Sequence, residues 1–147
     1  MQIWGFISST ISLIIIFAAS AAPIPLYAHY ADAMNLTKGQ LSLTAVMYFV
    51  GTVIALVFLA RISNYCGRKI SIYIVLLLGI IGCLSFIFVN SIEFLLLGRF
   101  MQGLACGLAS SSIIAFIIDN EPPHLKGLAT SIGSAGPNFG LAVGAVI

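Results

Sequence analysis

The sequence predicts an all-α protein, a polytopic bundle of about five transmembrane helices. Of its 147 residues, 61% are hydrophobic and only 7% are charged, whereas a soluble globular domain carries about 25% charged residues. The mean hydropathy is +1.15. The apolar residues fall into five runs, each close to the roughly 20 residues that a spanning helix needs, near 4–27, 40–60, 70–89, 94–118 and 127–147. We therefore expect residues 1–147 to form one partial transmembrane domain.

The first run ends in two prolines, Pro23 and Pro25. Proline lacks a backbone N–H and clashes with the preceding turn, so both residues should break or kink the far end of this helix. A cleaved signal peptide is the alternative, but no Lys or Arg precedes the apolar block, as a signal peptide requires. We expect an uncleaved first helix that extends over residues 4–27.

The loops and the third run carry weaker signals. Asn35 and Thr37 are candidate caps for the second helix. The run at 70–89 is apolar on all sides, which favours a peripheral helix that faces lipid. The three cysteines have no metal-ligand spacing, and the two histidines lie in separate loops. The sequence therefore predicts no enzyme, no metal site and no cofactor.

The basic residues predict the orientation. Four of them fall in the second and fourth loops, which share one side of the membrane: Arg61, Arg68, Lys69 and Lys126. Only Lys38 falls in a loop on the other side. Because cytoplasmic loops are enriched in Lys and Arg, we expect a cytoplasmic N-terminus in a cell (inner) membrane. The net charge of +2 reports this orientation and does not indicate a nucleic acid partner.

Arg99 is the sharpest single signal for function. It lies about two turns, or about 10 Å, inside the fourth run, where an arginine costs at least about 2–3 kcal/mol. Gln102 and Gly103 share its helix face. Snorkelling to the outer interface is the alternative, but 10 Å is close to the reach of the side chain. We expect Arg99 to face a cavity.

Small residues recur at four-residue spacing in the last two runs: Gly103 and Gly107, then Gly136, Gly140 and Gly144. Such spacing allows close helix approach. Pro137 should bend the last helix. This pattern fits a last helix that rocks against its neighbours during function. It fits equally well a helix that is only packed closely, with no such movement.

Three segments, in order, resemble motifs of a known family. Residues 60–69 read A-R-I-S-N-Y-C-G-R-K and resemble the loop motif G-x-L-x-D-R-x-G-R-K, with Ala60, Ile62, Asn64 and Tyr65 replacing four of its residues. Residues 99–103 resemble R-x-x-Q-G, and residues 136–140 resemble G-P-x-x-G, although Leu141 replaces a further glycine. Together they resemble the N-terminal half of a major facilitator superfamily transporter of the drug/proton antiporter type.

This resemblance implies a function and roles for single residues. It implies proton-coupled efflux of a drug or metabolite by an incomplete or truncated chain. The partners that it implies are the bilayer, a small-molecule substrate, a proton and the missing C-terminal helices of the same transporter. The implied substrate or proton pathway contains Arg99, Gln102 and Asn138. The implied gating loop contains Asn64, Gly67, Arg68 and Lys69, with Asp119 as the partner of Arg68. The residues expected to allow close helix packing or to bend a helix are Pro23, Pro25, Gly103, Gly107, Gly136, Pro137 and Gly140.

Two other functions stay open. A sugar or metabolite importer of the same superfamily would reverse the direction, and only the Gly-Pro element at residues 136–140 argues against it. A small non-transporting structural or regulatory membrane protein is the other alternative. The charge of Arg99 inside a span argues against that alternative.

Overall fold

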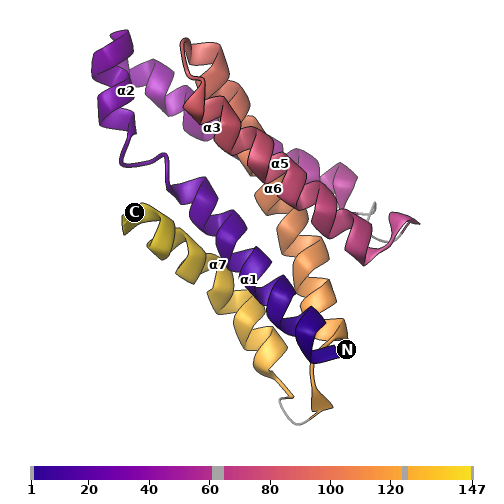
Figure 1. The fold of residues 1–147 in the computed structure, drawn as a ribbon. Coiled ribbons are helices and arrows are strands. Elements are labelled where there is room, and N and C mark those ends of the chain that lie inside the picture. The colour runs from indigo at the N-terminus through magenta and orange to yellow at the C-terminus, as the bar shows by residue number, and fades with distance from the viewer. Residues whose placement is uncertain (1, 61–64, 124–125, 147) are drawn as a thin grey trace.

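The computed structural model describes residues 2–60, 65–123 and 126–146, and every regular element within these ranges is helical (Figure 1). The elements are α1 (Gln2–Ala21), α2 (Tyr27–Met34), α3 (Lys38–Ile54), the π-helical turn η1 (Ala55–Leu59), α5 (Arg68–Ile87), α6 (Ile92–Asp119) and α7 (Leu128–Val146). The all-α class expected from the sequence is confirmed.

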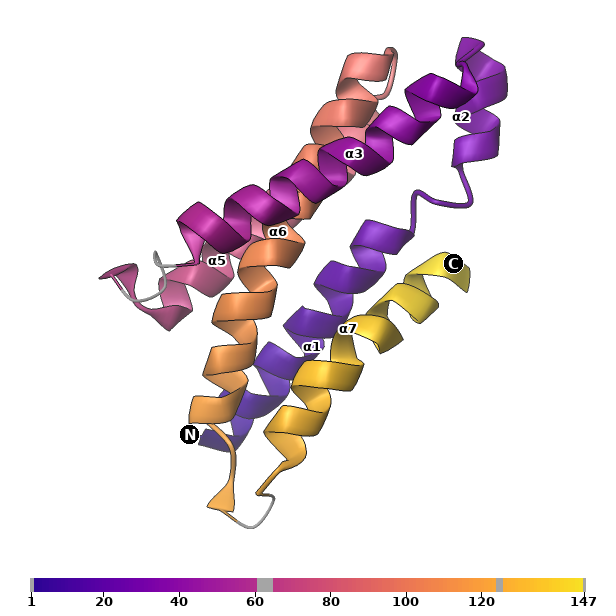
Figure 2. The ribbon, with the colours of Figure 1, turned by 180° about the vertical axis from the view of Figure 1, so that it is seen from behind.

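Four helices of the described chain are long and apolar enough to cross a membrane: α1, α3 continued by η1, α5 and α6. The fifth expected span, α7, forms a helix of 19 residues but is not in this group. Its glycines, serines and Asn138 interrupt its apolar residues. It nevertheless runs beside α1 along most of its length (Figures 1 and 2).

The expectation of one helix over residues 4–27 is wrong. α1 ends at Ala21, residues 22–26 form turns, and the chain resumes as the short helix α2, which the sequence analysis did not predict. Pro23 and Pro25 lie in this break, where neither could donate the backbone hydrogen bond that a continuing helix needs. The break therefore leaves the last carbonyl groups of α1 without partners in their own helix.

The two expected caps have different roles. Thr37 is the N-cap of α3, where its hydroxyl accepts a hydrogen bond from the backbone N–H of Gln40 at 3.3 Å, while the Gln40 side chain accepts one from the backbone N–H of Thr37 at 2.8 Å. This reciprocal pair is a capping box. Asn35 instead ends α2, in a left-handed conformation with φ of 50°, so it does not cap α3.

α6 is the central helix of the bundle. It packs closely against α3 and α5 and also contacts α1, while α7 packs mainly against α1. Its buried residues form most of the hydrophobic core, together with residues of α1. Those fully enclosed include Leu13, Leu95, Leu108, Ile113 and Ile117. Residues on α6 are therefore held by contacts on several sides.

Glycines set the close helix crossings. A Cβ atom added to Gly107 of α6 would lie 2.7 Å from the carbonyl oxygen of Thr52 in α3. One added to Gly140 of α7 would lie 2.6 Å from the carbonyl oxygen of Ile14 in α1. Both distances are too short for a side chain, so the two glycine rows serve different helix pairs.

α5 lies at the edge of the bundle, but it is not uniformly lipid-facing. Its outward side chains are large and exposed, among them Tyr73, Leu77 and Ile87. The opposite face, toward α6 and α1, is buried and rich in small residues: Ser71, Val75, Gly79, Gly82 and Ser85. The hydropathy pattern missed this face because small residues score as weakly polar rather than as packing residues.

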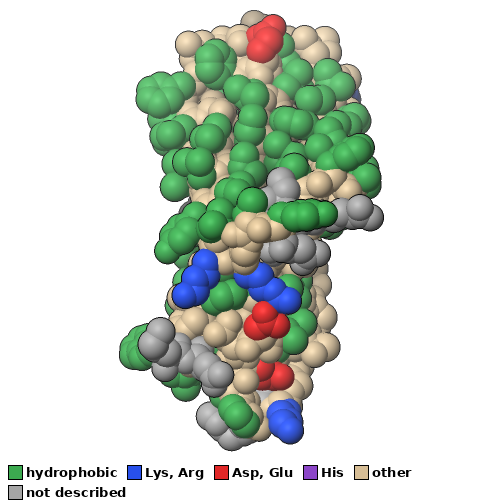
Figure 3. Space-filling view, turned by 90° about the vertical axis from the view of Figure 1, so that its right-hand side faces the viewer, with side chains coloured by type: hydrophobic (Ala, Val, Ile, Leu, Met, Phe, Trp, Pro, Cys, Tyr) green, Lys and Arg blue, Asp and Glu red, His purple; other side chains and the backbone are tan. Residues whose placement is uncertain are grey.

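The two ends of the bundle differ in charge. The N-terminus, the start of α5 and the α6–α7 connection lie at one end, and α2 lies at the other with the C-terminus (Figures 1 and 2). In Figure 3, most of the visible Lys, Arg, Asp and Glu side chains lie in one half of a face whose other half is largely hydrophobic, with an acidic side chain at its far end. This arrangement suits a multi-pass membrane protein.

Candidate functional site: a buried arginine beside a cavity

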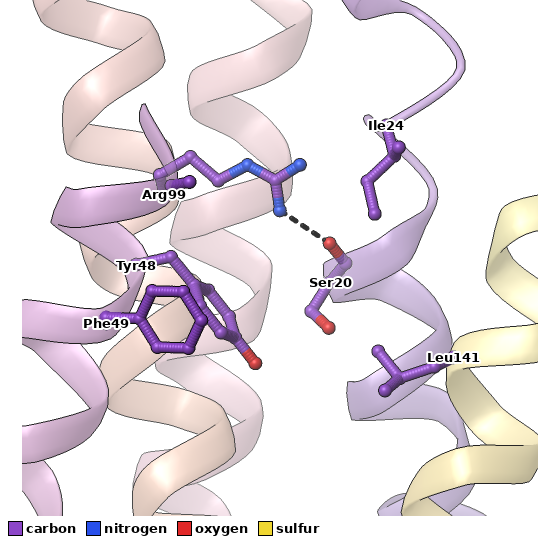
Figure 4. Close-up of a pocket in the computed structure, with 7 residues that line it drawn as sticks. Ser20, Ile24, Tyr48, Phe49, Arg99 and Leu141 are labelled. Carbon is purple, nitrogen blue, oxygen red and sulfur yellow. Dashed lines mark hydrogen bonds between the residues drawn. The ribbon is translucent and has the colours of Figure 1, made fainter. Parts of the chain in front are cut away.

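Arg99 lies inside the bundle and joins three helices. Its side chain is only 4% exposed, so it does not reach the outer interface by snorkelling. Its Nη1 atom donates to the carbonyl oxygen of Ser20 at 2.6 Å (Figure 4) and to Oε1 of Gln102 at 3.1 Å, and its Nε atom donates to the hydroxyl of Tyr27. The arginine of α6 is thereby tied to the end of α1 and the start of α2.

Among the described residues, dipoles and aromatic rings surround this charge, and no carboxylate pairs with it. The C-terminus of a helix carries partial negative charge on its free carbonyl groups, and α1 presents two of them here. Ser20 accepts from Arg99, and Ala19 accepts from Nε2 of Gln102 at 2.9 Å. The guanidinium carbon also lies 4.8 Å from the ring centre of Tyr27 and 5.6 Å from that of Phe86, which adds cation–π attraction. The cation is therefore stabilised by neutral groups.

Arg99 borders a cavity of about 400 Å³ between α1, α3, α6 and α7, a size within the range of small-molecule sites. Its wall is mostly apolar, with polar groups from Ser20, Tyr48 and Arg99 (Figure 4). The lining residues are Ser20, Ile24, Ala45, Tyr48, Phe49, Arg99 and Leu141. The cavity thus combines apolar and aromatic surface with one fixed positive charge.

The structure separates the three residues expected in the substrate or proton pathway. Arg99 borders the cavity, whereas Gln102 is buried behind it and orients its guanidinium. Asn138 is exposed on α7, donates to the carbonyl oxygen of Ser134 at 3.3 Å, and does not line this cavity.

Sequence reasoning missed Ser20, Tyr48 and Phe49. The two aromatic residues lie in the apolar run at 40–60, where nothing in the sequence distinguishes a cavity-facing aromatic residue from a lipid-facing one. Ser20 offered a weak signal, because it is a polar residue at the end of an apolar block. Helix packing, which the sequence does not specify directly, brings them together.

The expected partner of Arg68 is in place. Arg68 forms an ion pair with Asp119, and the same guanidinium also donates to the carbonyl oxygen of Ala115. These contacts join the first turn of α5 to the last turn of α6. Both side chains are partly exposed, at 37% and 50%, so the pair contributes at most about 1 kcal/mol to stability.

The loop expected to contain Arg68 and Lys69 is shorter than predicted, because α5 begins at Arg68. Gly67 precedes it with φ of 89°, a conformation that glycine adopts without steric cost. Asn64 lies outside the described residues, so its role in the loop stays a prediction.

Glu121 has a role that the sequence analysis did not predict. Its Oε1 atom accepts a hydrogen bond at 2.8 Å from the backbone N–H of Ala129, in the first turn of α7. A carboxylate at a helix N-terminus is favourable because it satisfies a free N–H group and the helix dipole. The side chain thereby fixes where α7 begins after the α6–α7 connection.

Comparison with known proteins places these features in a family. The Major Facilitator Superfamily profile matches residues 9–147. Sugar transporter ERD6-like 6 of Arabidopsis thaliana is 26% identical over 117 residues, which cover 80% of this chain and 24% of that protein. Sugar transporter ERD6-like 12 of the same plant is 29% identical over 110 residues, which cover 75% of this chain and 24% of that protein.

A yeast protein shows the same partial coverage. Vacuolar protein sorting-associated protein 73 of Saccharomyces cerevisiae is 29% identical over 103 residues, covering 70% of this chain and 21% of that protein. The chain thus spans about a quarter of the length of these relatives. No solved structure matches it. Because the family profile covers nearly the whole chain, this multi-pass membrane protein belongs to the Major Facilitator Superfamily, whose members are transporters rather than enzymes.

Proposed function

We propose that this chain, together with further helices of the same transporter, carries a sugar or a similar polyol across the cell membrane. The observation that carries this proposal is the cavity beside Arg99, which combines aromatic faces, hydroxyl groups and a fixed cation. The similarity to sugar transporters supports the same substrate class.

The cavity wall suits a neutral polyol. The rings of Tyr48 and Phe49 offer flat apolar surface for the C–H face of a sugar, and the phenol of Tyr48 also offers a polar group. Arg99 adds hydrogen-bonding groups on the same side as these rings, and Ser20 adds them from the facing side (Figure 4). A few polar groups in an apolar cavity are what small-molecule sites use to fix a ligand's orientation.

The family resemblance implied efflux of a drug or metabolite, and this cavity disfavours any such substrate that is a cation. Arginine keeps its positive charge in proteins, and none of the cavity-lining residues is an acid, so a cationic substrate would be repelled. The Gly136–Gly140 element, which suggested an exporter, packs against Leu13 and Ile14 of α1. That packing requirement holds whichever way the substrate moves. An acid that binds a coupled proton would have to come from other helices.

Two phenylalanines of the same span allow a matched test. Phe49 lines the cavity, whereas Phe58, whose side chain is similarly exposed, does not line it. In proteoliposomes with the complete transporter, Phe49→Ala should lower uptake of labelled hexoses about tenfold through lost ring contact. Phe58→Ala should change uptake less than twofold. Equal losses in both variants would contradict a sugar site in this cavity.

Arg99 variants test the polar side of the cavity. Arg99→Ala removes hydrogen bonds to a charged group, each worth about 1.5–3 kcal/mol, and should lower uptake at least about tenfold with normal membrane abundance. Arg99→Lys should keep part of the activity. The positive charge is retained, but the planar guanidinium group, which can donate two parallel hydrogen bonds, is lost. Full uptake by the alanine variant, or transport of cationic drugs without sugars by the unmodified protein, would overturn the proposal.

A further inference from the structure

A side chain of α6 bridges the break between α1 and α2. Arg99 donates to the carbonyl oxygen of Ser20, which precedes the break, and to the hydroxyl of Tyr27, which follows it. Ile24, inside the break, lines the cavity that Arg99 borders, whereas Tyr27 is not among the residues that line it. Tyr27 is therefore connected to the cavity through Arg99.

We infer that Tyr27 is a positioning residue for Arg99. Its hydroxyl fixes the plane of the guanidinium, so that this group meets a sugar in one orientation. Tyr27 thereby sets the affinity for the substrate without touching it. The inference rests on the proposed sugar transport and extends it to a residue outside the cavity wall.

The hydrogen bonds of Arg99 leave one of its nitrogen atoms for a ligand. Nε donates to Tyr27, and Nη1 donates to Ser20 and Gln102, whereas Nη2 donates to none of the described residues. In Figure 4, the terminal nitrogen that is not bonded to Ser20 points away from that residue, on the side of Ile24. A guanidinium is planar and carries five N–H groups in a fixed arrangement. Fixing Nε and Nη1 therefore also fixes the direction of Nη2.

Tyr27 is itself held by contacts that do not involve Arg99. Its backbone N–H donates to the carbonyl oxygen of Ile24 at 3.2 Å, within the hydrogen-bonded turns of the break. Three residues further along α2, the hydroxyl of Tyr30 donates to the carbonyl oxygen of Phe86 in α5 at 3.4 Å. α2 is thus tied to α5 separately from Arg99, and the Tyr27 hydroxyl serves as a fixed acceptor.

The two tyrosines of α2 give a matched test in proteoliposomes that contain the complete transporter. Tyr27→Phe keeps the ring, whose centre lies 4.8 Å from the guanidinium carbon of Arg99, and removes only the hydroxyl. It should raise the KM for hexose uptake about fivefold and change kcat less than about twofold, because a lost orientation weakens binding rather than turnover. Tyr30→Phe makes the same change in the same helix, away from Arg99, and should alter neither constant.

A second background separates positioning from a structural role. Arg99→Lys has no Nε–H group for Tyr27 to accept, so adding Tyr27→Phe to it should raise KM by less than about twofold. A change that merely loosened α2 would instead multiply with the effect of Arg99→Lys, because independent changes are additive in free energy. Losses of similar size in both backgrounds, or equal losses in the Tyr27 and Tyr30 variants, would contradict the inference.

Nuclear magnetic resonance of the complete transporter in nanodiscs, with ¹⁵N-labelled arginine, reads the same contact without a substrate. The Nε–H signal of Arg99 is identified by its absence in Arg99→Lys. It should move upfield in Tyr27→Phe, in which the ring remains but the hydrogen bond is lost, and stay unchanged in Tyr30→Phe. A signal that Tyr27→Phe leaves unmoved would overturn the inference. Absence of hexose uptake by the unmodified protein would overturn the sugar function instead, because this signal still shows whether Tyr27 holds Arg99.

Discussion

Arg99 shows how one residue can be stabilised by a helix break. Burying a charge costs several kcal/mol unless polar groups surround it. Pro23 lies just after the end of α1, and the freed carbonyl groups of Ala19 and Ser20 then receive Gln102 and Arg99. The helix break and the buried charge stabilise each other. The guanidinium gains hydrogen-bond acceptors, and the free carbonyl groups at the end of α1 gain donors. The prolines and the arginine thus form one site despite their separation in sequence.

Arg68 and Asp119 allow a prediction at the same scale. Arg68→Asp and Asp119→Arg should each lower transport several-fold, because each breaks the contact between the start of α5 and the end of α6. The free energy of unfolding should change by no more than about 1 kcal/mol, since the pair is partly exposed. The doubly reversed variant should restore part of the transport; Arg68 also donates to Ala115, so recovery is incomplete. Uptake assays check the effect on transport, and urea denaturation checks the free energy of unfolding. A double variant as inactive as the single variants would argue against a joint role of Arg68 and Asp119 in transport.

At the level of elements, glycines decide which helices pair. The α1–α7 contact depends on Gly136, Gly140 and Gly144, whereas the α3–α6 crossing depends on Gly51, Gly103 and Gly107. Membrane helices gain little from hydrophobic burial against one another, so close backbone approach provides much of their association energy. The spacing of glycines in the sequence predicted close packing but could not identify the partner helix.

Gly140 provides a test of this contact. Gly140→Leu should destabilise the α1–α7 pair, because its side chain would overlap Ile14 and Phe17 of α1; overpacking of this kind typically costs about 1–3 kcal/mol. Ala142→Leu, on the exposed side of α7, is the matched control and should have little effect. Thermal unfolding in detergent measures both variants. An unchanged melting temperature for Gly140→Leu would mean that α7 does not need this contact.

At the level of the whole molecule, the two ends of the bundle face opposite sides of the membrane. The basic residues Arg68, Lys69 and Lys126 lie near the N-terminal end, and Lys38 lies at the other. The positive-inside rule makes the former end cytoplasmic, which remains a prediction for this chain.

Cysteine labelling checks this orientation. Cys66 is exposed, whereas Cys106 is buried, so Cys66 should react with a membrane-impermeant maleimide only after cells are permeabilised. Lys38→Cys in a Cys66→Ser background should react in intact cells. Ready labelling of Cys66 from outside would show that the orientation is the reverse of the one expected.

Local chemistry allowed several features to be predicted from the sequence alone. The class, the apolar runs and the charged ends follow from hydropathy and charge, which each segment carries whatever its neighbours are. The capping role of Thr37 and the break at Pro23 and Pro25 are equally local, because they depend on backbone groups within a few residues. For the same reason the depth of Arg99 could be judged from its position in its run.

Only the tertiary structure decided what those residues meet. The partners of Arg99 and the cavity wall at Tyr48 and Phe49 depend on which helix faces which. Between apolar helices this choice follows from small residues and shape rather than from hydropathy, so a one-dimensional pattern cannot specify it. The sequence by itself determined that a membrane bundle forms with a buried cation; the packing of α1 against α6 and α7 determined that the cation stands beside a cavity.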